Sequence, residues 1–329
     1  MKKIFIFALV SSIVLFFSFP VFSFSQKNLS FLYGNYLKGL SYFNEGKYKE
    51  ALEAFNKAKS IDPDSSDIRI KISFVLVRLG KLKEAEKELK EVKKLDSQNL
   101  EASLGLIFLY SYLGKNKELE DEYGEFLEKA HQLRPQDTKV SEYLAQFYFY
   151  RKRIDDAIRL YETIVKIHPD YIDARYLLGY LYDEKGNREK AIEIWEKILE
   201  ENPSHVNTLN ALGYVYAEEG INLDKAEEMI KKALEQDPNN GAYLDSLGWV
   251  YFKRQSYKKA EEYLKKAVSN TKDPVIYEHI GDLYIKLNDI DIALDYYKKG
   301  LELDPQSKSL KEKITEYERE DKKSQTKGE

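Results

Sequence analysis

Small, aromatic and charged residues recur in a fixed order about every 34 residues from residue 31 to residue 305. Each unit has a glycine, alanine or serine, and in most units a tyrosine follows three positions later, as in Gly179 and Tyr182. An alanine begins a second apolar run, and a large apolar residue follows it four positions later, as in Ala191 and Trp195. Spacings of three and four residues put these side chains on one face of a helix. Each unit therefore predicts two amphipathic helices.

Helix-breaking residues divide this pattern at regular places. A glycine or a polar residue separates the two helical runs inside most units, and a proline closes most units because it cannot continue a helix. Successive closing positions are 33 to 38 residues apart. One helix pair cannot bury its own apolar face, so the pairs are expected to stack on one another. The closing positions are Pro63, Ser97, Pro135, Pro169, Pro203, Pro238, Lys272 and Pro305.

This order of residues resembles the tetratricopeptide repeat over residues 31–305. The resemblance implies an all-α fold, an α-solenoid of about eight helix-turn-helix repeats that forms a right-handed superhelix with a concave groove lined by the first helices. The third unit is four residues longer than the usual period, with charged residues 115–122 where its second helix is expected to start, and the sixth unit has one extra residue. Residues 209–254 look like repeat proteins of bacterial cell envelopes. The expected repeats are residues 32–65, 66–99, 100–137, 138–171, 172–205, 206–240, 241–273 and 274–307.

The pattern changes after the last closing proline. Residues 307–317 predict a helix with Leu310, Ile314 and Tyr317 on one stripe and charged residues on the other face. A helix of this kind covers the apolar edge at the end of a repeat array. Residues 318–329 are charged and lack large apolar side chains, so we expect a disordered tail.

The first 25 residues have the layout of a secretory signal peptide. Two lysines precede an apolar run at residues 4–19, and the small residues Ser23 and Ser25 suit a cleavage site. The alternative is an uncleaved membrane anchor, because the apolar run approaches the ~20 residues that span a bilayer. The positive end stays in the cytoplasm in both cases. We therefore expect the repeats to be exported, in the periplasm or elsewhere outside the cytoplasm.

Charge and composition argue against several classes of function. The chain has 52 lysines and arginines against 56 acids, so it lacks the basic excess that nucleic-acid binding needs. It has no cysteine, which excludes disulfides, thiolate metal sites and cysteine nucleophiles. His131, His168, His205 and His279 do not have the spacing of a metal-binding helix, and no phosphate-binding glycine loop is present. We predict no catalytic, metal or cofactor site and no enzyme activity.

The resemblance also implies that positions 2, 5, 9 and 12 of each unit face the concave groove. In the fifth to seventh units these positions carry aromatic residues, amides and acids. They suit an interface, although aromatic residues on first helices often serve packing within the array. Acids outnumber the single nearby base, Lys253, which favours a cationic or proline-containing segment of a partner. The groove residues expected to contact a partner are Asp173, Tyr176, Tyr180, Asn207, Asn210, Tyr214, Asp245 and Trp249.

Two functions remain open from the sequence. The first is a protein–protein interaction scaffold outside the cytoplasm that binds a peptide or protein partner in its groove, in envelope assembly, secretion or pilus biogenesis. The second is a carbohydrate- or peptidoglycan-binding module, because tyrosines beside acids and amides also suit sugar rings. A more apolar groove near the N-terminus, with Tyr33, Tyr36, Phe43 and Phe74, predicts a second contact surface or a self-association patch.

Overall fold

The computed structural model describes residues 26–325, with side chains described as far as residue 319. All regular secondary structure in this range is α-helical, as the repeat pattern predicts. The chain divides between Leu133 and Arg134 into two compact units, which we describe separately.

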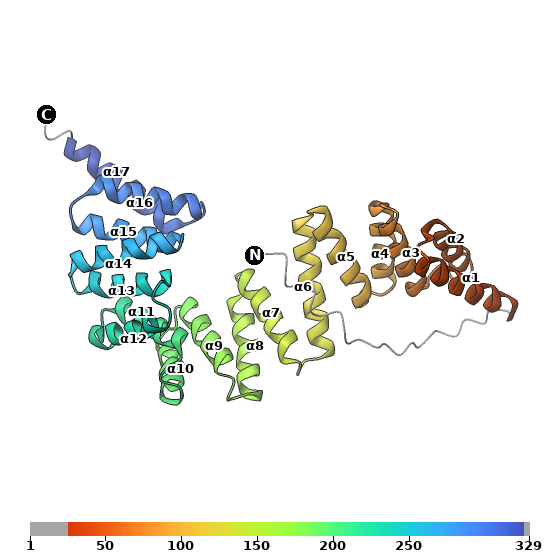
Figure 1. Ribbon diagram of the computed structural model, residues 1–329, viewed down its shortest axis with the longest axis horizontal. Coiled ribbons are helices and arrows are strands. Elements are labelled where there is room, and N and C mark those ends of the chain that lie inside the picture. Colours follow the sequence, from red (N-terminus) through yellow and green to blue (C-terminus); the bar gives the residue numbers. More distant parts are fainter. Residues whose placement is uncertain (1–25, 326–329) are drawn as a thin grey trace. The chain divides into compact units, whose positions relative to one another are not determined.

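The described part of the first unit, residues 26–133, contains six helices (Figure 1, red to yellow), which pair in chain order as helical hairpins. The first helix of each hairpin packs against the second helix of the hairpin before it. The helices are α1 (Gln26–Asn44), α2 (Tyr48–Lys59), α3 (Ser66–Arg78), α4 (Leu82–Leu95), α5 (Leu100–Leu113) and α6 (Asn116–Leu133).

The second unit contains five further hairpins and a final single helix (Figure 1, yellow-green to blue). Its helices are α7 (Thr138–Tyr150), α8 (Ile154–Ile167), α9 (Ile172–Glu184), α10 (Arg188–Glu201), α11 (Val206–Glu219), α12 (Leu223–Gln236), α13 (Gly241–Lys253), α14 (Tyr257–Asn270), α15 (Pro274–Lys286), α16 (Ile290–Leu303) and α17 (Lys308–Gln325). The apolar side chains that the repeat pattern places inside these hairpins form one continuous core in this unit.

Glycines on the first helices allow the second helix of the same hairpin to approach closely. A Cβ atom added to Gly39 would lie 2.6 Å from the ring of Phe55, which is closer than non-bonded carbon atoms can pack. The indole of Trp195 fills the same space above Gly179 and is 1% exposed. The small residue and the large one are therefore two sides of a single contact, repeated from hairpin to hairpin.

The tyrosine that follows each small residue has a second role between hairpins. On α9, α11, α13 and α15 its hydroxyl donates to a glutamate on the second helix of the preceding hairpin. The distances are 2.6 Å from Tyr216 to Glu196, 2.8 Å from Tyr251 to Glu227 and 2.7 Å from Tyr284 to Glu261. The Tyr182 hydroxyl makes the same contact with Glu162. Tyrosine therefore fills apolar space with its ring and links neighbouring hairpins with its hydroxyl.

In each described hairpin, the turn between the two helices contains a residue in the left-handed backbone region. Glycine adopts this conformation without steric cost, whereas other residues pay a small penalty. The sixth hairpin has a second such residue, Asn222 with φ of 48°, directly before α12, and this is where its extra residue is accommodated. The residues that close the eight turns are Gly46, Gly80, Gly114, Lys152, Gly186, Gly220, Gln255 and Asn288.

The third hairpin accommodates its extra residues inside a helix. Helix α6 has 18 residues, against 14 in α4 and α8, and it begins at Asn116 within the charged segment 115–122. Four residues are close to one helical turn of 3.6 residues, so the insertion preserves the orientation of the buried face. Phe126, Leu127 and Ala130 keep that face buried.

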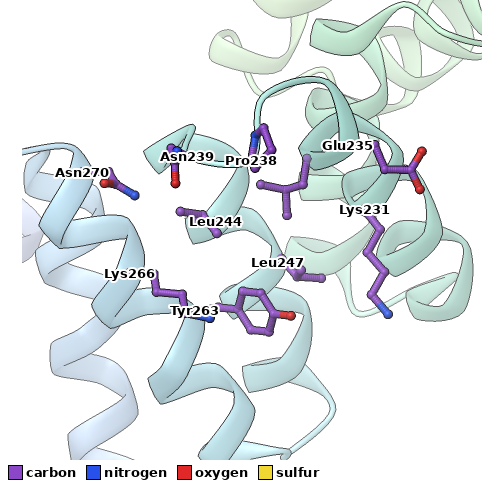
Figure 2. Close-up of a pocket in the computed structure, with 10 residues that line it drawn as sticks. Lys231, Glu235, Pro238, Asn239, Leu244, Leu247, Tyr263, Lys266 and Asn270 are labelled. Carbon is purple, nitrogen blue, oxygen red and sulfur yellow. The ribbon is translucent and has the colours of Figure 1, made fainter.

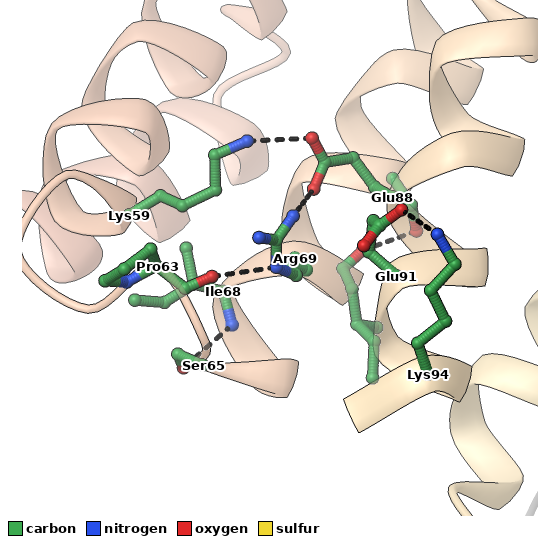
Figure 3. Close-up of polar contacts among 10 residues, drawn as sticks. Lys59, Pro63, Ser65, Ile68, Arg69, Glu88, Glu91 and Lys94 are labelled. Carbon is green, nitrogen blue, oxygen red and sulfur yellow. Dashed lines mark hydrogen bonds and ion pairs between the residues drawn. The ribbon is translucent and has the colours of Figure 1, made fainter. Parts of the chain in front are cut away.

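Partly buried ion pairs also join neighbouring hairpins. Figure 3 shows Glu88 on α4 between Lys59 of α2 and Arg69 of α3, with both nitrogen–oxygen distances at 2.7 Å. Arg69 Nε also donates to the carbonyl oxygen of Pro63 at 2.9 Å, and Ser65 caps the N-terminus of α3. These side chains are 15–25% exposed, so solvent screens their interaction less than that of a fully exposed pair.

Helix α17 covers the end of the last hairpin. Leu310 is 1% exposed, and the rings of Tyr317 and Tyr297 stack with their centres 6.2 Å apart. Lys313 Nζ lies 2.8 Å from Glu278 and 2.6 Å from Asp282 on α15. The apolar stripe thus packs as the sequence predicts.

Helix α17 is longer than the sequence predicts. It continues past residue 317 to Gln325, through most of the segment expected to be a disordered tail. The added stretch has neither glycine nor proline and consists mainly of charged residues that favour helices. The remaining tail residues, 326–329, and the expected signal at residues 1–25 lie outside the described residues. Among the helices of residues 26–325, none is both long enough and apolar enough to cross a membrane.

Candidate functional site

The predicted contact residues lie on three neighbouring first helices of the second unit, α9, α11 and α13, and α15 continues the same series. We call the surface formed by these four helices the first-helix face. Six of the eight predicted residues lie in or between two groups on this face, and the other two, Asp245 and Trp249, are buried. One group lies near the N-terminal ends of the helices and the other near their C-terminal ends.

The first group centres on Tyr176. Its ring lies 6.4 Å from the Trp195 indole and 5.8 Å from the His205 imidazole, measured between ring centres. Burial raises the pKa of Tyr176 above its ordinary value. Asp173 is 71% exposed, with His205 Nε2 3.5 Å from its carboxylate. Asn207 is exposed and accepts a hydrogen bond of 3.1 Å from the Tyr243 hydroxyl. This end of the face presents an open carboxylate and an amide beside a partly buried ring.

Tyr180 and Asp183 form the second group together with Arg188. Tyr180 is partly exposed and packs edge-to-face on Phe149 of α7 at 5.7 Å. Burial, and then the neighbouring carboxylate of Glu184, raises the pKa of Tyr180. Burial also raises the pKa of Asp183, although Arg188 acts in the opposite direction.

Arg188 comes from the start of the second helix α10, not from a first helix. Its Nε lies 3.4 Å from Asp183, and a terminal guanidinium nitrogen lies 3.7 Å from Glu218 on α11. The repeat pattern did not point to Arg188, because only first helices were expected to face the groove. Its position at the first residue of α10, directly after the turn of the fifth hairpin, is the sequence feature that could have indicated this location. Arg188 is therefore a second base on this face beside Lys253, and the face is less acidic than the sequence suggests.

Asn210 and Tyr214 lie between the two groups on α11. Both side chains are partly exposed, but the Asn210 Oδ1 atom is buried and has no hydrogen-bond partner. Burial raises the pKa of Tyr214, and the carboxylates of Glu218 and Asp245 add to the effect. A tyrosine with a raised pKa stays a neutral hydrogen-bonding group at every physiological pH. Tyr214 can contribute contact area and a hydrogen bond to a partner, whereas the buried Asn210 Oδ1 atom is out of a partner's reach.

Asp245 and Trp249 are not exposed contacts, contrary to the sequence prediction. Each is 6% exposed, because residues of the neighbouring helices cover them. The Trp249 ring lies between Phe252, at 4.5 Å, and His279 of α15, at 4.0 Å. Its indole N–H donates to Glu218. Both residues support the face from beneath, and a partner does not reach them unless this packing opens.

A cavity of about 640 Å³ lies on α12, α13 and α14 of the second unit (Figure 2). Leu234, Leu244 and Leu247 contribute apolar surface to it. Lys231 and Lys266 also line it, but each already pairs with a glutamate of its own helix, at 2.6 and 2.7 Å. No sequence motif predicted this cavity. Among the described residues, no group of histidine, aspartate and glutamate side chains is arranged to hold a metal ion.

Comparison with known protein families is consistent with this architecture. Models described as "Tetratricopeptide repeat" match residues 42–106 and 148–213, residues 222–274, and residues 275–307. Together these segments cover most of the chain. The chain belongs to the tetratricopeptide-repeat family. No curated protein matches the sequence of this tetratricopeptide-repeat protein.

Solved structures show the same fold. A thermophilic tetratricopeptide-repeat protein of Thermus thermophilus is 24% identical, with a TM-score of 0.50; the match covers 55% of this chain and 98% of that one. A chain of the APC/C hetero-tetramer Cut9–Hcn1 is 18% identical, with a TM-score of 0.53; the match covers 82% of this chain and 52% of that one. These likenesses concern the fold alone. As an array of tetratricopeptide repeats, the protein is a protein–protein interaction scaffold.

Proposed function

We propose that this tetratricopeptide-repeat protein is a non-enzymatic adaptor, exported from the cytoplasm, that holds a protein or peptide partner against the first-helix face. The observation that supports this most directly is the row of partly exposed rings of Tyr176, Tyr180 and Tyr214 on two adjoining helices. Tyrosine gives a large contact area at a low cost in side-chain entropy, and its hydroxyl bonds to polar groups of a partner.

The partner segment in this proposal is cationic or contains proline. Asp173 and Glu184 are exposed, and each lies on α9 near one of the tyrosines. A lysine or arginine of the partner gains attraction from these carboxylates, and a proline ring packs against a tyrosine face. Asp183 suits a cation less well, because Arg188 already lies beside it. A partner that used Asp183 would first have to displace Arg188.

Export is the remaining part of the proposal. It rests on Lys2 and Lys3, on the apolar run at residues 4–19 and on the small residues Ser23 and Ser25. Intact-mass measurement of the protein recovered from its own host tests it. Loss of the first 23 or 25 residues supports export, and a full-length chain in the cytoplasmic fraction contradicts it. Envelope assembly, secretion and pilus biogenesis are the processes that such a location suits.

Site-specific crosslinking tests the binding face. A photo-crosslinking amino acid replaces exposed Asn207, and a control protein has it in place of Lys197, which is 62% exposed on the second helix α10. A protein crosslinked at position 207 and not at position 197 is the candidate partner. Calorimetry then compares its binding to the wild type and to the Tyr180→Ala, Tyr214→Ala and Lys197→Ala variants. We expect about tenfold or greater weakening for each tyrosine variant and no change for Lys197→Ala.

Two outcomes contradict the proposal. Equal binding by all variants places the partner elsewhere on the chain. Crosslinking of glycan in place of protein at position 207 favours the carbohydrate-binding alternative.

A further inference from the structure

The first unit has a row of exposed apolar side chains on its own first helices. Leu37 on α1 is 63% exposed, Phe74 on α3 is 37% exposed, and Phe108 and Tyr112 on α5 are 53% and 72% exposed. Tyr33, one helical turn before Leu37, is 46% exposed. Single exposed apolar residues are ordinary, but rows of them on adjoining elements mark interaction surfaces.

Polar contacts join the three helices along one side. The Tyr36 side chain of α1 hydrogen-bonds to Asp67 of α3. Burial is the larger cause, and this contact the second, of the raised pKa of Tyr36. On the other side, Lys71 of α3 lies 3.4 Å from Glu101 of α5 and 3.7 Å from Asp67. Contacts therefore run from α1 through α3 to α5 along the same side of the helices.

The exposed residues of α3 lie along this same side. Asp67, Lys71, Phe74 and Arg78 are spaced four, three and four residues apart, which places them on one stripe of the helix. Phe108 and Tyr112 likewise follow Glu101 along one stripe of α5. The exposed rings therefore adjoin the chain of polar contacts.

On this face the carboxylates are paired within the protein, whereas a positive charge is free to contact a partner. Both carboxylates, Asp67 and Glu101, are already paired with Lys71, and that lysine also lies over the Phe74 ring at 5.6 Å. Arg78, on the same stripe of α3, is exposed and has no ion-pair partner among the described residues. The charge left for a partner is therefore positive. The first-helix face of the second unit has exposed charges of the opposite sign, the carboxylates of Asp173 and Glu184.

We propose that this face of α1, α3 and α5 is a second binding surface, which takes a protein segment that combines apolar side chains with carboxylates. The apolar side chains pack on Phe74, Phe108 and Leu37, and a carboxylate pairs with Arg78. The Arg78 guanidinium can hold a carboxylate through two parallel hydrogen bonds, a geometry that a lysine does not offer. The protein then has two binding surfaces on one chain, one for a segment with carboxylates and one for a cationic segment. It can thereby join two different partners.

Peptide selection tests the proposal without a known partner. A random peptide library displayed on phage is selected on residues 26–329, which contain every described helix. It is first depleted on the Phe74→Ala/Phe108→Ala/Arg78→Glu triple variant, so that only peptides that need this face remain. All three residues are exposed, and circular dichroism confirms that the variant folds. We expect the retained peptides to be rich in glutamate or aspartate beside aromatic or aliphatic residues.

Binding of a synthesised peptide is then measured by fluorescence anisotropy. We expect about tenfold or greater weakening for Phe108→Ala and for Arg78→Glu, and no change for Tyr180→Ala on the other face. A library selected on Arg78→Glu should change its preference to lysine-containing peptides. Charge-independent selection, or binding that tolerates both Phe108→Ala and Arg78→Glu, overturns the proposal.

Two other occupants of the face give distinct results. Concentration-dependent dimerisation in sedimentation experiments, abolished by Phe108→Ser, assigns the face to a second copy of the chain and overturns the proposal. Peptide binding by residues 26–329 that disappears when residues 1–25 are retained assigns it to the N-terminal segment, with the same consequence. A library that yields no peptide dependent on this face also counts against it.

Discussion

The His279 imidazole lies 2.9 and 3.0 Å from the two carboxylate oxygens of Asp245, and both side chains are buried. This pair joins α15 to α13, and the ring also stacks on Trp249 at 4.0 Å. Burial lowers the pKa of His279, but the attraction and hydrogen bond of Asp245, together with the charges of Asp282 and Glu218, outweigh burial, and the net direction is upward. The imidazolium form is therefore stabilised in the folded protein.

This pair predicts a pH-dependent stability of the second unit. A histidine whose pKa is raised by folding stabilises the protein fully below its unfolded value, about 6.5, and this contribution is lost as the pH rises through the folded value. We expect the difference in thermal midpoint between wild type and His279→Gln to be largest near pH 6 and to shrink toward pH 9. Circular dichroism melting curves measure it.

The groups around His279 define the controls for that experiment. Glu218 of α11 and Asp282 of α15 act in the same direction as Asp245, whereas Lys313 of α17 neutralises Asp282. Asp245→Asn should remove most of the pH dependence in the same way as His279→Gln. Parallel melting curves for wild type and His279→Gln across this range would show that His279 does not titrate there.

A matched pair of glycines in α1 tests the contact inside a hairpin. A Cβ on Gly39 would lie 2.6 Å from Phe55, whereas nothing lies within 4 Å of a Cβ on Gly34. We expect Gly39→Ala to destabilise the first unit by about 1–3 kcal/mol through overpacking. Gly34→Ala should stabilise it by about 0.5–1 kcal/mol through helix propensity. Urea unfolding measures both, and similar effects of the two changes would contradict the close contact.

Leu310 tests the capping role of α17. It is 1% exposed against the last hairpin, whereas Lys308, two residues earlier, has an 88% exposed side chain. We expect Leu310→Ala to cost about 2–5 kcal/mol in the stability of the second unit and Lys308→Ala to cost almost nothing. Removal of residues 307–329 should also promote aggregation, measured by light scattering. A truncated protein that stays monomeric with an unchanged melting curve would refute the capping role.

The Tyr216 hydroxyl tests the hydrogen bond between hairpins. It donates to Glu196 at 2.6 Å, and the ring itself is 2% exposed. Tyr216→Phe keeps the ring and removes the bond, so we expect a loss of about 1–3 kcal/mol for a hydrogen bond to a charged acceptor. Chemical denaturation measures the loss. The Glu196→Gln variant should lose less than Tyr216→Phe, because a glutamine can still accept the hydrogen bond.

The hairpins could be predicted from the sequence because their signals are local. Gly179 and Trp195 are 16 positions apart and meet inside one hairpin, so the repeat pattern contains both sides of the contact. The left-handed turn residues and the closing prolines lie next to the helices that they end. Local patterns of this kind define elements and their pairing well.

The candidate site was less predictable because its exposure depends on distant residues. Trp249 is buried by His279, which belongs to the next hairpin, and Arg188 reaches the face from a second helix. A rule that assigns fixed repeat positions to the groove predicts neither the burial of Trp249 nor the position of Arg188. The tyrosines at positions 176, 180 and 214 are partly exposed.

The extra helical turn of α6 has a consequence for how chains of this type change in length. An insertion of about four residues keeps the buried face in phase, whereas one or two residues inside a helix rotate everything beyond them by about 100° or 200°. The single extra residue of the sixth hairpin lies in a turn, next to Asn222. Insertions and deletions in such arrays should therefore survive in only three sizes: single residues in turns, whole turns in helices and whole hairpins.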